Sequence, residues 1–500
     1  MILLYHYVMN KMRVPYRESL LTGLAIFMLV AHSYGQETAL VLTLSDAIGR
    51  AQANSPKIVE AETILENQYW QYQTFRSNYR PQIRLAGQLP NFNRTIAPIT
   101  QNDGSEAFKP RSYSNSSLNL GMSQKIGLTG GEISIGSQIG RIDQFTDTST
   151  VSYLASPAVI TYQQPLFAFN PYKWDKEIEP LRYESSKRQY LENKENVSLD
   201  ATILFFELLL AQESSKISQL NLHNSDTIYQ IAKGRYQLGK IAESGLLQME
   251  LSLMNAKRDL ALAEMDMDLS SLELAMFLGL TGKEVISVAI PDELPEFIVD
   301  EDDALNQATA NSSRTLNFEI RRLEGHRLIG QAKGESGINA NLFTSYGVTN
   351  STMVFDELYT DPIDKQLILL GFDIPIIDWG RSKAQIRTAE ANKKLIDVMV
   401  LQDEQSFKQE IYLTVRRFNI YRQNLFIAEK ADQIAQKRYA VTFSRYMIGK
   451  VVTLDLKDAQ EEKDLSRRAY IRALADAWNS YYELRLKTLY DFDKKKLIEE

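Results

Sequence analysis

The chain has 500 residues, a formal net charge of −7 and no cysteine. Its lysines and arginines do not form a basic patch interleaved with aromatic residues, which argues against nucleic acid as a partner. The absence of cysteine excludes disulfide bonds, thiolate metal sites and a lipidated N-terminal cysteine.

The first predicted element is a secretory signal peptide over residues 1–35. Lys11, Arg13 and Arg17 precede an apolar run at 20–30, and small and polar residues follow it. This order is typical of a cleaved export signal, and the run is too short for a helix that spans a membrane. Later apolar runs are also too short, so we expect any membrane crossing to be made by strands.

An internal repeat organises the rest of the chain. The segment Arg-Tyr-Gln-Leu-Gly-Lys at 235–240 recurs as Arg-Tyr-Met-Ile-Gly-Lys at 445–450, and Pro165 recurs as Pro375. Both pairs are 210 residues apart. A constant offset over this distance indicates a duplication.

The two copies differ in length. Residues 47–55 match residues 304–312 at an offset of 257, so the first copy contains 47 additional residues. These residues must lie between Pro81 and Pro165. They include two alternating segments around Leu120 and Ile135, which predict a further hairpin near 118–140. The sequence leaves open whether this hairpin adds strands to a barrel or extends outside it.

Both copies have the same predicted order of elements: a helix, then strands, then a long helical hairpin. The first copy covers 36–280, with a helix at 44–79 capped by Thr43 or Ser45, strands at about 82–165 and a hairpin at about 172–280. A linker at 281–301 leads to the second copy at 302–490, with a helix at 302–333, strands at about 338–375 and a hairpin at about 381–490. Residues 491–500 form a charged C-terminal tail.

The strand segments alternate between apolar and polar residues, as in Ile83-Arg84-Leu85. This period of two is typical of a barrel strand between lipid and a polar lumen, although a soluble sandwich has it too. In the hairpins, a helix of ~60 residues is ~90 Å long, longer than a globular domain. Apolar residues at three-four spacing, such as Leu199 and Ile203, form a seam, so these helices are expected to pack in a bundle or tube.

This duplicated order resembles the TolC-like outer membrane efflux protein family over nearly the whole mature chain. The likeness is carried by Leu-Ser-Asp-Ala at 44–47, Asn-Ser-Pro at 54–56, Gln-Pro-Leu-Phe at 164–167 and the two Arg-Tyr-x-x-Gly-Lys turns. The second turn continues as Thr-Leu-Asp-Leu-Lys-Asp-Ala at 453–459, close to the periplasmic tip sequence of the family. Pro165 and Pro375 then mark the two strand-to-helix junctions.

The resemblance implies an α+β fold with duplicated outer-membrane β-barrel strands and long α-helical hairpins, which form a trimeric barrel and a periplasmic helical tunnel. It implies the passive exit duct of a tripartite efflux or type I secretion system in the outer membrane of a Gram-negative bacterium, extending into the periplasm. The implied partners are two further copies of the chain, outer-membrane lipid, a periplasmic adaptor and an inner-membrane transporter. No cofactor is implied.

The resemblance also implies roles for individual residues at the periplasmic tip. Asp455 and Asp458 match the acidic constriction of the family's closed tip. Tyr446 and Tyr236, which precede the two tip turns, are candidates for contacts that hold the tip shut or receive the adaptor. The alternatives are acids that complement the dipole of a helix capped by Thr453, and tyrosines that only pack the hairpins.

The hairpin-tip turns are Gly239-Lys240 and Gly449-Lys450, where adaptor docking is expected. Val451 stands where some relatives have an arginine that braces the closed state. Gly245 stands where the first hairpin can have an aspartate.

Two other functions compete with this interpretation. An enzyme would need a phosphate-binding loop, a zinc-binding His-Glu-x-x-His motif or a cysteine nucleophile, and the sequence has none of them. His223 and His326 are expected to be surface or structural residues, so we expect no catalytic and no metal site. The second rival is a non-conducting periplasmic coiled-coil scaffold, which would not explain the repeated strands.

Overall fold

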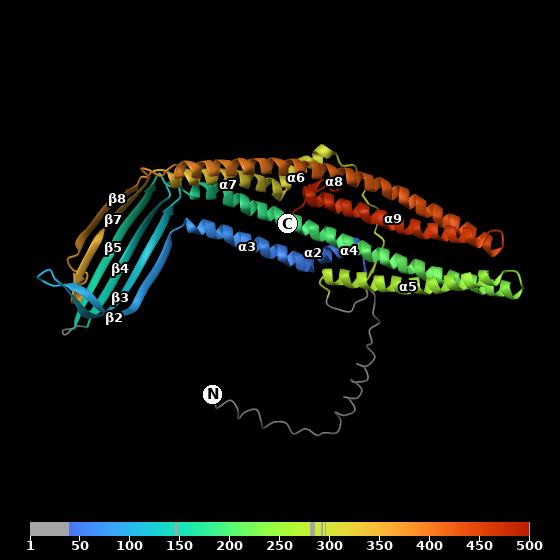
Figure 1. The fold of residues 1–500 in the computed structure, drawn as a ribbon, viewed down its shortest axis with the longest axis horizontal. Helices are drawn as coiled ribbons and strands as arrows, with labels where there is room; N and C mark the ends of the chain where they lie inside the picture. Colours follow the sequence, from blue (N-terminus) through green and yellow to red (C-terminus); the bar gives the residue numbers. More distant parts are fainter. Residues whose placement is uncertain (1–39, 146–148, 281–285, 292–293, 296, 500) are drawn as a thin grey trace, which may run out of the picture. The chain divides into compact units, whose positions relative to one another are not determined.

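The computed structural model describes residues 40–145, 149–280, 286–291, 294–295 and 297–499 (Figure 1). The predicted signal peptide lies outside these residues. The chain divides into two units, each described here by itself. The tip unit comprises residues up to Ala51, Ala201–Glu293 and Ile434–Arg472, and the sheet unit comprises Gln52–Asp200, Leu294–Gln433 and Ala473–Glu500. Among the described residues, no helix combines the length and apolar character needed to cross a membrane.

A six-stranded antiparallel sheet dominates the sheet unit (Figure 1). Its strands, in their spatial order, are β2 (Gln82–Thr100), β3 (Glu106–Ile126), β4 (Gly131–Gln144), β5 (Thr150–Leu166), β7 (Asn339–Thr352) and β8 (Ile363–Asp373). The additional residues of the first copy therefore supply β3 and β4, which pair inside the sheet between β2 and β5.

The first helix of each copy is broken, whereas the sequence predicted one continuous helix. α2 (Leu44–Asn54) and α3 (Pro56–Asn78) meet at Ser55, and α6 (Glu301–Asn311) and α7 (Ser313–Ser336) meet at Ser312. Each serine has an extended backbone, and its hydroxyl accepts a hydrogen bond from the backbone N–H two residues later. This is the conformation of a helix cap, and in the first copy Pro56 also disfavours a helical residue before it.

Three long helices pass through both units: α4 (Tyr172–Gln237), α8 (Arg381–Met447) and α9 (Thr453–Thr488). In the sheet unit, residues of α6, α7, α8 and α9 enclose one apolar core, which includes Phe318, Phe407, Ile411, Phe418 and Leu484. Burial of these large side chains supplies the main force that holds the helices together. The predicted tail is not a plain extension, because β9 (Tyr490–Asp491) pairs with β10 (Lys496–Leu497).

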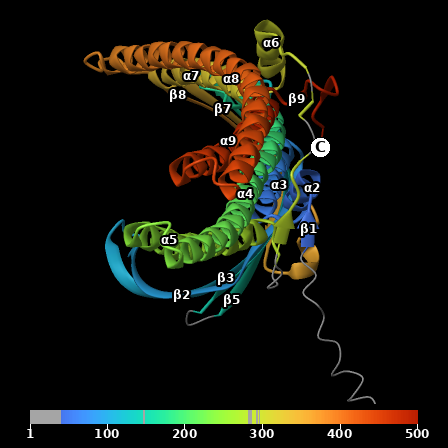
Figure 2. The ribbon, with the colours of Figure 1, turned by 90° about the vertical axis from the view of Figure 1, so that its right-hand side faces the viewer.

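In the tip unit, α5 (Glu243–Phe277) lies beside the C-terminal half of α4 in both views (Figures 1 and 2). The linker also contains a short strand, β6 (Ile286–Val288), which pairs in parallel with β1 (Leu40–Leu42). Of the two caps expected for the first helix, Thr43 is the one used. Its hydroxyl accepts a hydrogen bond from the Asp46 N–H at 3.2 Å, and its own hydroxyl and N–H donate to the Asp46 carboxylate at 2.7 and 3.2 Å.

Candidate functional site at the hairpin tips

The turn that joins α4 to α5 has a defined hydrogen-bond pattern. The Gly239 N–H donates to the Tyr236 carbonyl at 2.8 Å, and the Lys240 N–H donates to the Arg235 carbonyl at 2.8 Å. Gly239 has a φ of +67°, which favours glycine over residues with a side chain. These bonds satisfy carbonyls that the end of α4 would otherwise leave free.

The turn that joins α8 to α9 repeats this pattern. The Gly449 N–H donates to the Tyr446 carbonyl at 2.9 Å, and the Lys450 N–H donates to the Arg445 carbonyl at 3.0 Å. Gly449 has a φ of +74°. The two copies of the repeated motif therefore end their long helices with the same turn, which leaves Lys240 and Lys450 exposed.

The two predicted tip tyrosines have different environments. Tyr446 is 5% exposed, and the Arg235 guanidinium carbon lies 5.8 Å from its ring centroid. Tyr236 is 40% exposed. Tyr446 thus packs between the first and second hairpins inside the tip unit, whereas Tyr236 remains exposed.

Asp455 and Asp458 both lie on the exposed side of the first turns of α9. Leu456 and Ala459, at 2% and 1% exposure, are buried and anchor the helix. Neither carboxylate forms an ion pair with another described residue. α9 begins at Thr453, so Val452 rather than Thr453 occupies the capping position, while Asp455 lies in the first turn, where the helix dipole favours an acid.

A charge cluster around the buried Glu213, further along the tip unit, was not predicted from the sequence. The Arg467 Nε and Nη2 donate to the Glu213 carboxylate at 3.0 and 2.9 Å, and Lys216 donates to it at 2.8 Å. Burial works to raise the pKa of Glu213, but the hydrogen bonds from Lys216 and Arg467 outweigh it and hold the pKa below its ordinary value. The sequence does contain a signal for this cluster. The charged residue Glu213 lies between Leu210 and Ile217, two apolar residues of the seam along α4.

A second polar layer lies next to this cluster. The Asn221 amide donates to the Asp464 carboxylate at 2.6 Å, and the Asn224 amide donates to the Tyr439 hydroxyl at 3.0 Å. Burial, reinforced by the Asp464 charge, raises the pKa of Tyr439. The Lys463 ammonium lies 4.4 Å from the centroid of the Tyr439 ring. Such polar layers align helices in one register, because a shifted helix would leave these groups buried without partners.

The strand-to-helix junctions contain two exposed aromatic residues. Pro165 is still part of β5 and pairs with Asn341, whereas Pro375 follows the end of β8. Beyond each proline, Phe167 and Trp379 adopt positive φ angles of 65° and 55° and are 77% and 95% exposed. Bulky residues rarely adopt this conformation, so the surrounding chain must hold them there.

Asp378 fixes the start of α8 beside Trp379. Its carboxylate accepts hydrogen bonds from the Gly380 N–H at 2.9 Å and the Ser382 N–H at 2.8 Å. Hydrogen bonding to Ser382, together with the Gly380 N–H, lowers the pKa of Asp378 to about 2. The junction therefore keeps its cap ionised at every physiological pH.

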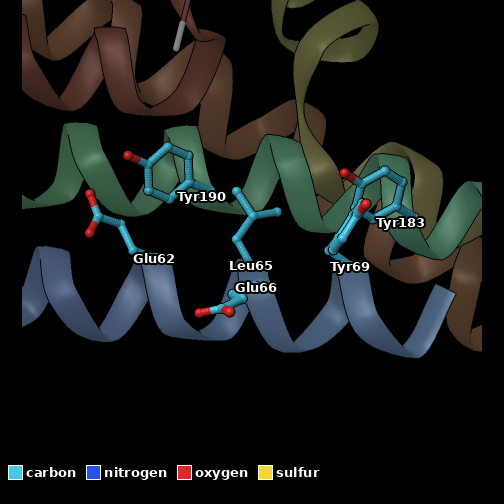
Figure 3. Close-up of a pocket in the computed structure, with 6 residues that line it drawn as sticks. All are labelled: Glu62, Leu65, Glu66, Tyr69, Tyr183 and Tyr190. Atoms are coloured by element: carbon cyan, nitrogen blue, oxygen red, sulfur yellow. The ribbon is translucent and has the colours of Figure 1, made fainter. Parts of the chain in front are cut away.

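A shallow groove lies between α3 and α4 of the sheet unit (Figure 3). Its lining residues are Glu62, Leu65, Glu66, Tyr69, Tyr183 and Tyr190. Leu65 lies between Tyr190 on one side and the Tyr69–Tyr183 pair, whose ring centroids are 6.0 Å apart, on the other. In the described part of the chain, no cluster of three or more histidines or carboxylates could hold a metal ion. His223 and His326 both have exposed side chains.

Comparison with known protein families decides the class of this chain. Residues 47–280 and 338–487 match the family model described as "Outer membrane efflux protein". The chain belongs to this family. As an outer membrane efflux protein it is a channel protein rather than an enzyme, and it lies in the outer membrane and extends into the periplasm.

Solved structures share the fold of this outer membrane efflux protein. The Campylobacter jejuni CmeC outer membrane channel is 17% identical with a TM-score of 0.65, and the match covers 91% of this chain and 87% of that one. The Vibrio cholerae outer membrane protein VceC is 14% identical with a TM-score of 0.63, covering 91% and 97%. The open state of the Neisseria gonorrhoeae MtrE outer membrane channel is 16% identical with a TM-score of 0.60, covering 91% of each chain.

A comparison with curated protein sequences found no match. The family and the fold therefore stand on the family model and on the solved structures. The roles of individual tip residues in this outer membrane efflux protein remain predictions.

Proposed function

We propose that three copies of this outer membrane efflux protein form the passive exit duct of a tripartite efflux or type I secretion system. An inner-membrane transporter supplies the energy, and a periplasmic adaptor joins it to the duct at Gly239-Lys240 and Gly449-Lys450. Asp455 and Asp458 line the closed mouth, with Tyr446 and Tyr236 bracing it. The protein itself requires no cofactor.

The observation that carries this proposal is an exposed apolar stripe along α5, interrupted only at Arg258 between Met254 and Leu262. Its leucines and methionines recur at three-four spacing and are about half exposed: Leu247, Leu251, Met254, Leu262, Met265, Leu269, Leu272 and Met276. The other face of α5 is already buried, at Leu253, Ala256 and Leu274. Apolar surface of this extent is typical of an interface with another protein chain.

A second stripe on α8 supports the same conclusion. Leu413, Ile420, Ile427, Ile434 and Val441 recur at every seventh residue and are 55–65% exposed. A strict seven-residue repeat is the pattern of a helix that packs along another helix. A helix with a second apolar face can pack against a helix of a neighbouring copy through that face. Several copies that pack in this way can form a closed tube.

The test is the mass of the detergent-solubilised protein, for which we expect a trimer. Leu262→Glu with Leu269→Glu should lower the trimer fraction, because charged residues would enter the interface between copies. Glu264→Ala, an exposed position on α5 outside the stripe, is the matched control. A stable wild-type monomer, or equal trimer fractions in both variants, would contradict the proposal.

Membrane extraction separates the duct from the scaffold alternative. A duct inserted in the outer membrane should require detergent for release and should conduct ions in a planar bilayer. Release by salt or urea, without conductance, would instead support a scaffold.

A further inference from the structure

The additional hairpin of the first copy is an integral part of the sheet. β3 pairs with β2 from Gln82 to Thr100, and β5 pairs with β4 from Glu132 to Gln144. β7 then continues the sheet on the other side of β5. The first copy therefore contributes four strands and the second copy two.

The turn between β3 and β4 contacts the strand-to-helix junction between β5 and α4. The Asn170 amide donates to the Gly127 carbonyl at 2.9 Å, and the Gln164 amide donates to the Thr129 carbonyl at 2.9 Å. A Cβ atom on Gly127 would lie 2.0 Å from a ring carbon of Tyr172, so any other residue there would displace the ring. These contacts fix the turn between β3 and β4 next to the C-terminal end of β5.

One row of paired residues on one face of the sheet is apolar in five of the six strands and ends at Gln366 of β8. A cross-strand row runs through Ile83 of β2, Met122 of β3, Ile135 of β4, Ile160 of β5 and Tyr346 of β7. All five side chains are more than one third exposed. An exposed apolar row that includes β3 and β4 is the pattern of strands facing lipid.

The neighbouring row, on the opposite face, has glycine at three of its six positions. It runs from Arg84 through Gly121, Gly136, Val159 and Gly347 to Lys365. These glycines place no side chain on this side of the sheet, which suits the wall of a wide lumen.

The sheet has two open edges. Among the described strands, β2 pairs only with β3, and β8 pairs only with β7. Unpaired backbone groups in lipid cost several kcal/mol each, so each edge needs a partner. β2 contains Arg84 and Arg94 and no acidic residue, whereas β8 contains Asp364, Asp373 and one lysine. This complementary charge favours pairing of β2 with β8 of a second copy over pairing of like edges.

We infer that three copies close into a barrel of eighteen strands, in which β2 of each copy pairs with β8 of the next. This inference rests on the proposed trimer. With strands ~4.8 Å apart and tilted by ~40°, eighteen strands give a backbone diameter of ~36 Å, against ~24 Å for twelve strands if the hairpin lay outside. The larger barrel has more than twice the cross-section of the smaller one.

Electron cryomicroscopy of the wild-type protein in detergent tests the strand number directly. Eighteen strands in a trimer are expected. A trimer with twelve barrel strands, and β3 and β4 outside the wall, would overturn this inference while leaving the proposed duct intact. A particle that is not a trimer would overturn both.

Cross-linking identifies the paired edges, because the chain has no cysteine of its own. Ala86→Cys is combined in turn with Lys365→Cys, Leu367→Cys and Leu369→Cys, since these positions share one face of the sheet. At least one combination should give covalent dimers and trimers that a reductant dissolves, and each single cysteine should give none. Disulfides confined to monomers, or absent from every combination, would overturn the β2–β8 contact between copies.

Discussion

At the scale of single residues, Arg485 is the clearest example of a charge that the fold requires. Its guanidinium donates two hydrogen bonds to Glu195, at 2.8 and 3.0 Å, and one to Asp491 at 2.6 Å. Glu195 is 1% exposed. Burial alone would lower the pKa of Arg485, but the paired Glu195 raises it above its ordinary value. The network ties the C-terminal hairpin of the sheet unit to α4.

Arg485→Met should therefore destabilise the protein by about 3–5 kcal/mol, because it leaves Glu195 buried without a partner. The measurement is urea unfolding of the detergent-solubilised protein, followed by tryptophan fluorescence. Glu195→Gln combined with Arg485→Met should recover part of the loss, since the Glu195 charge is then gone and only the Asp491 carboxylate has lost its cation. If the single variant unfolds like the wild type, the network contributes no net stability.

At the scale of elements, the two tip turns depend on the backbone conformation of one glycine each. A Cβ atom on Gly239 or Gly449 would meet nothing within 4 Å, so only the positive φ disfavours a side chain there. That conformation costs a residue with a side chain about 1–2 kcal/mol.

Gly239→Val and Gly449→Val should distort the tips and lower export, because adaptor docking is proposed at these turns. Trimer assembly should survive, since the sheet and the stripes are untouched. Gly245→Val is the matched control, because Gly245 has open space and no positive φ. Export assays and mass measurement in detergent check both parts. Normal export in both tip variants would count against docking there.

The junction aromatics are also an element-scale feature. Trp379 is 95% exposed beside the apolar side chains of Ile376 and Ile377, which are 90% and 73% exposed. Aromatic residues at the edge of a lipid-facing band typically lie among the headgroups. We therefore expect Trp379 to contact lipid.

A variant that keeps only Trp379 of the four tryptophans should lose much of its fluorescence in vesicles of brominated lipid. The matched control keeps only Trp70, which lies in α3 about 12 Å before the end of that helix and is 57% exposed. We expect little quenching in this control. Equal quenching in both variants would place Trp379 away from the headgroups.

At the scale of the whole molecule, the proposed trimer would bring three copies of Asp455 and Asp458 to one mouth. Within a single copy both carboxylates are exposed and have no ion-pair partner among the described residues. A ring of six carboxylates would attract multivalent cations, because their fields add inside a narrow opening.

A trivalent cation on the periplasmic side should therefore block wild-type current in a planar bilayer. Asp455→Ala with Asp458→Ala should remove most of the block, while expression and trimer formation stay unchanged. Glu250→Ala with Glu264→Ala removes two exposed acids from α5 and should leave the block intact. Equal block in all three proteins would mean that the acids only complement the helix dipole.

Local patterns in the sequence were enough to predict several features. The long helices follow from apolar residues at three-four spacing, and the turns at Gly239 and Gly449 follow from a motif repeated at a constant offset. These features depend on residues near each other in the chain, where helical spacing and glycine conformation act directly. The sequence also contains a signal for the break at Ser55, because a serine before a proline is typical of a helix cap. The helical spacing of apolar residues on both sides of Ser55 nevertheless predicts one continuous helix.

Only the tertiary structure decided how the strands are ordered and which side chains are covered. Alternation of period two identifies a strand, but it does not say which strand is its neighbour, because the pairing hydrogen bonds join residues far apart in the chain. The hairpin near 118–140 is therefore placed only by the pairing of β3 with β2 and of β4 with β5 in the folded sheet. For the same reason, Tyr236 and Tyr446 look equivalent in the repeated motif, yet only Tyr446 is buried, under Arg235 from the other hairpin.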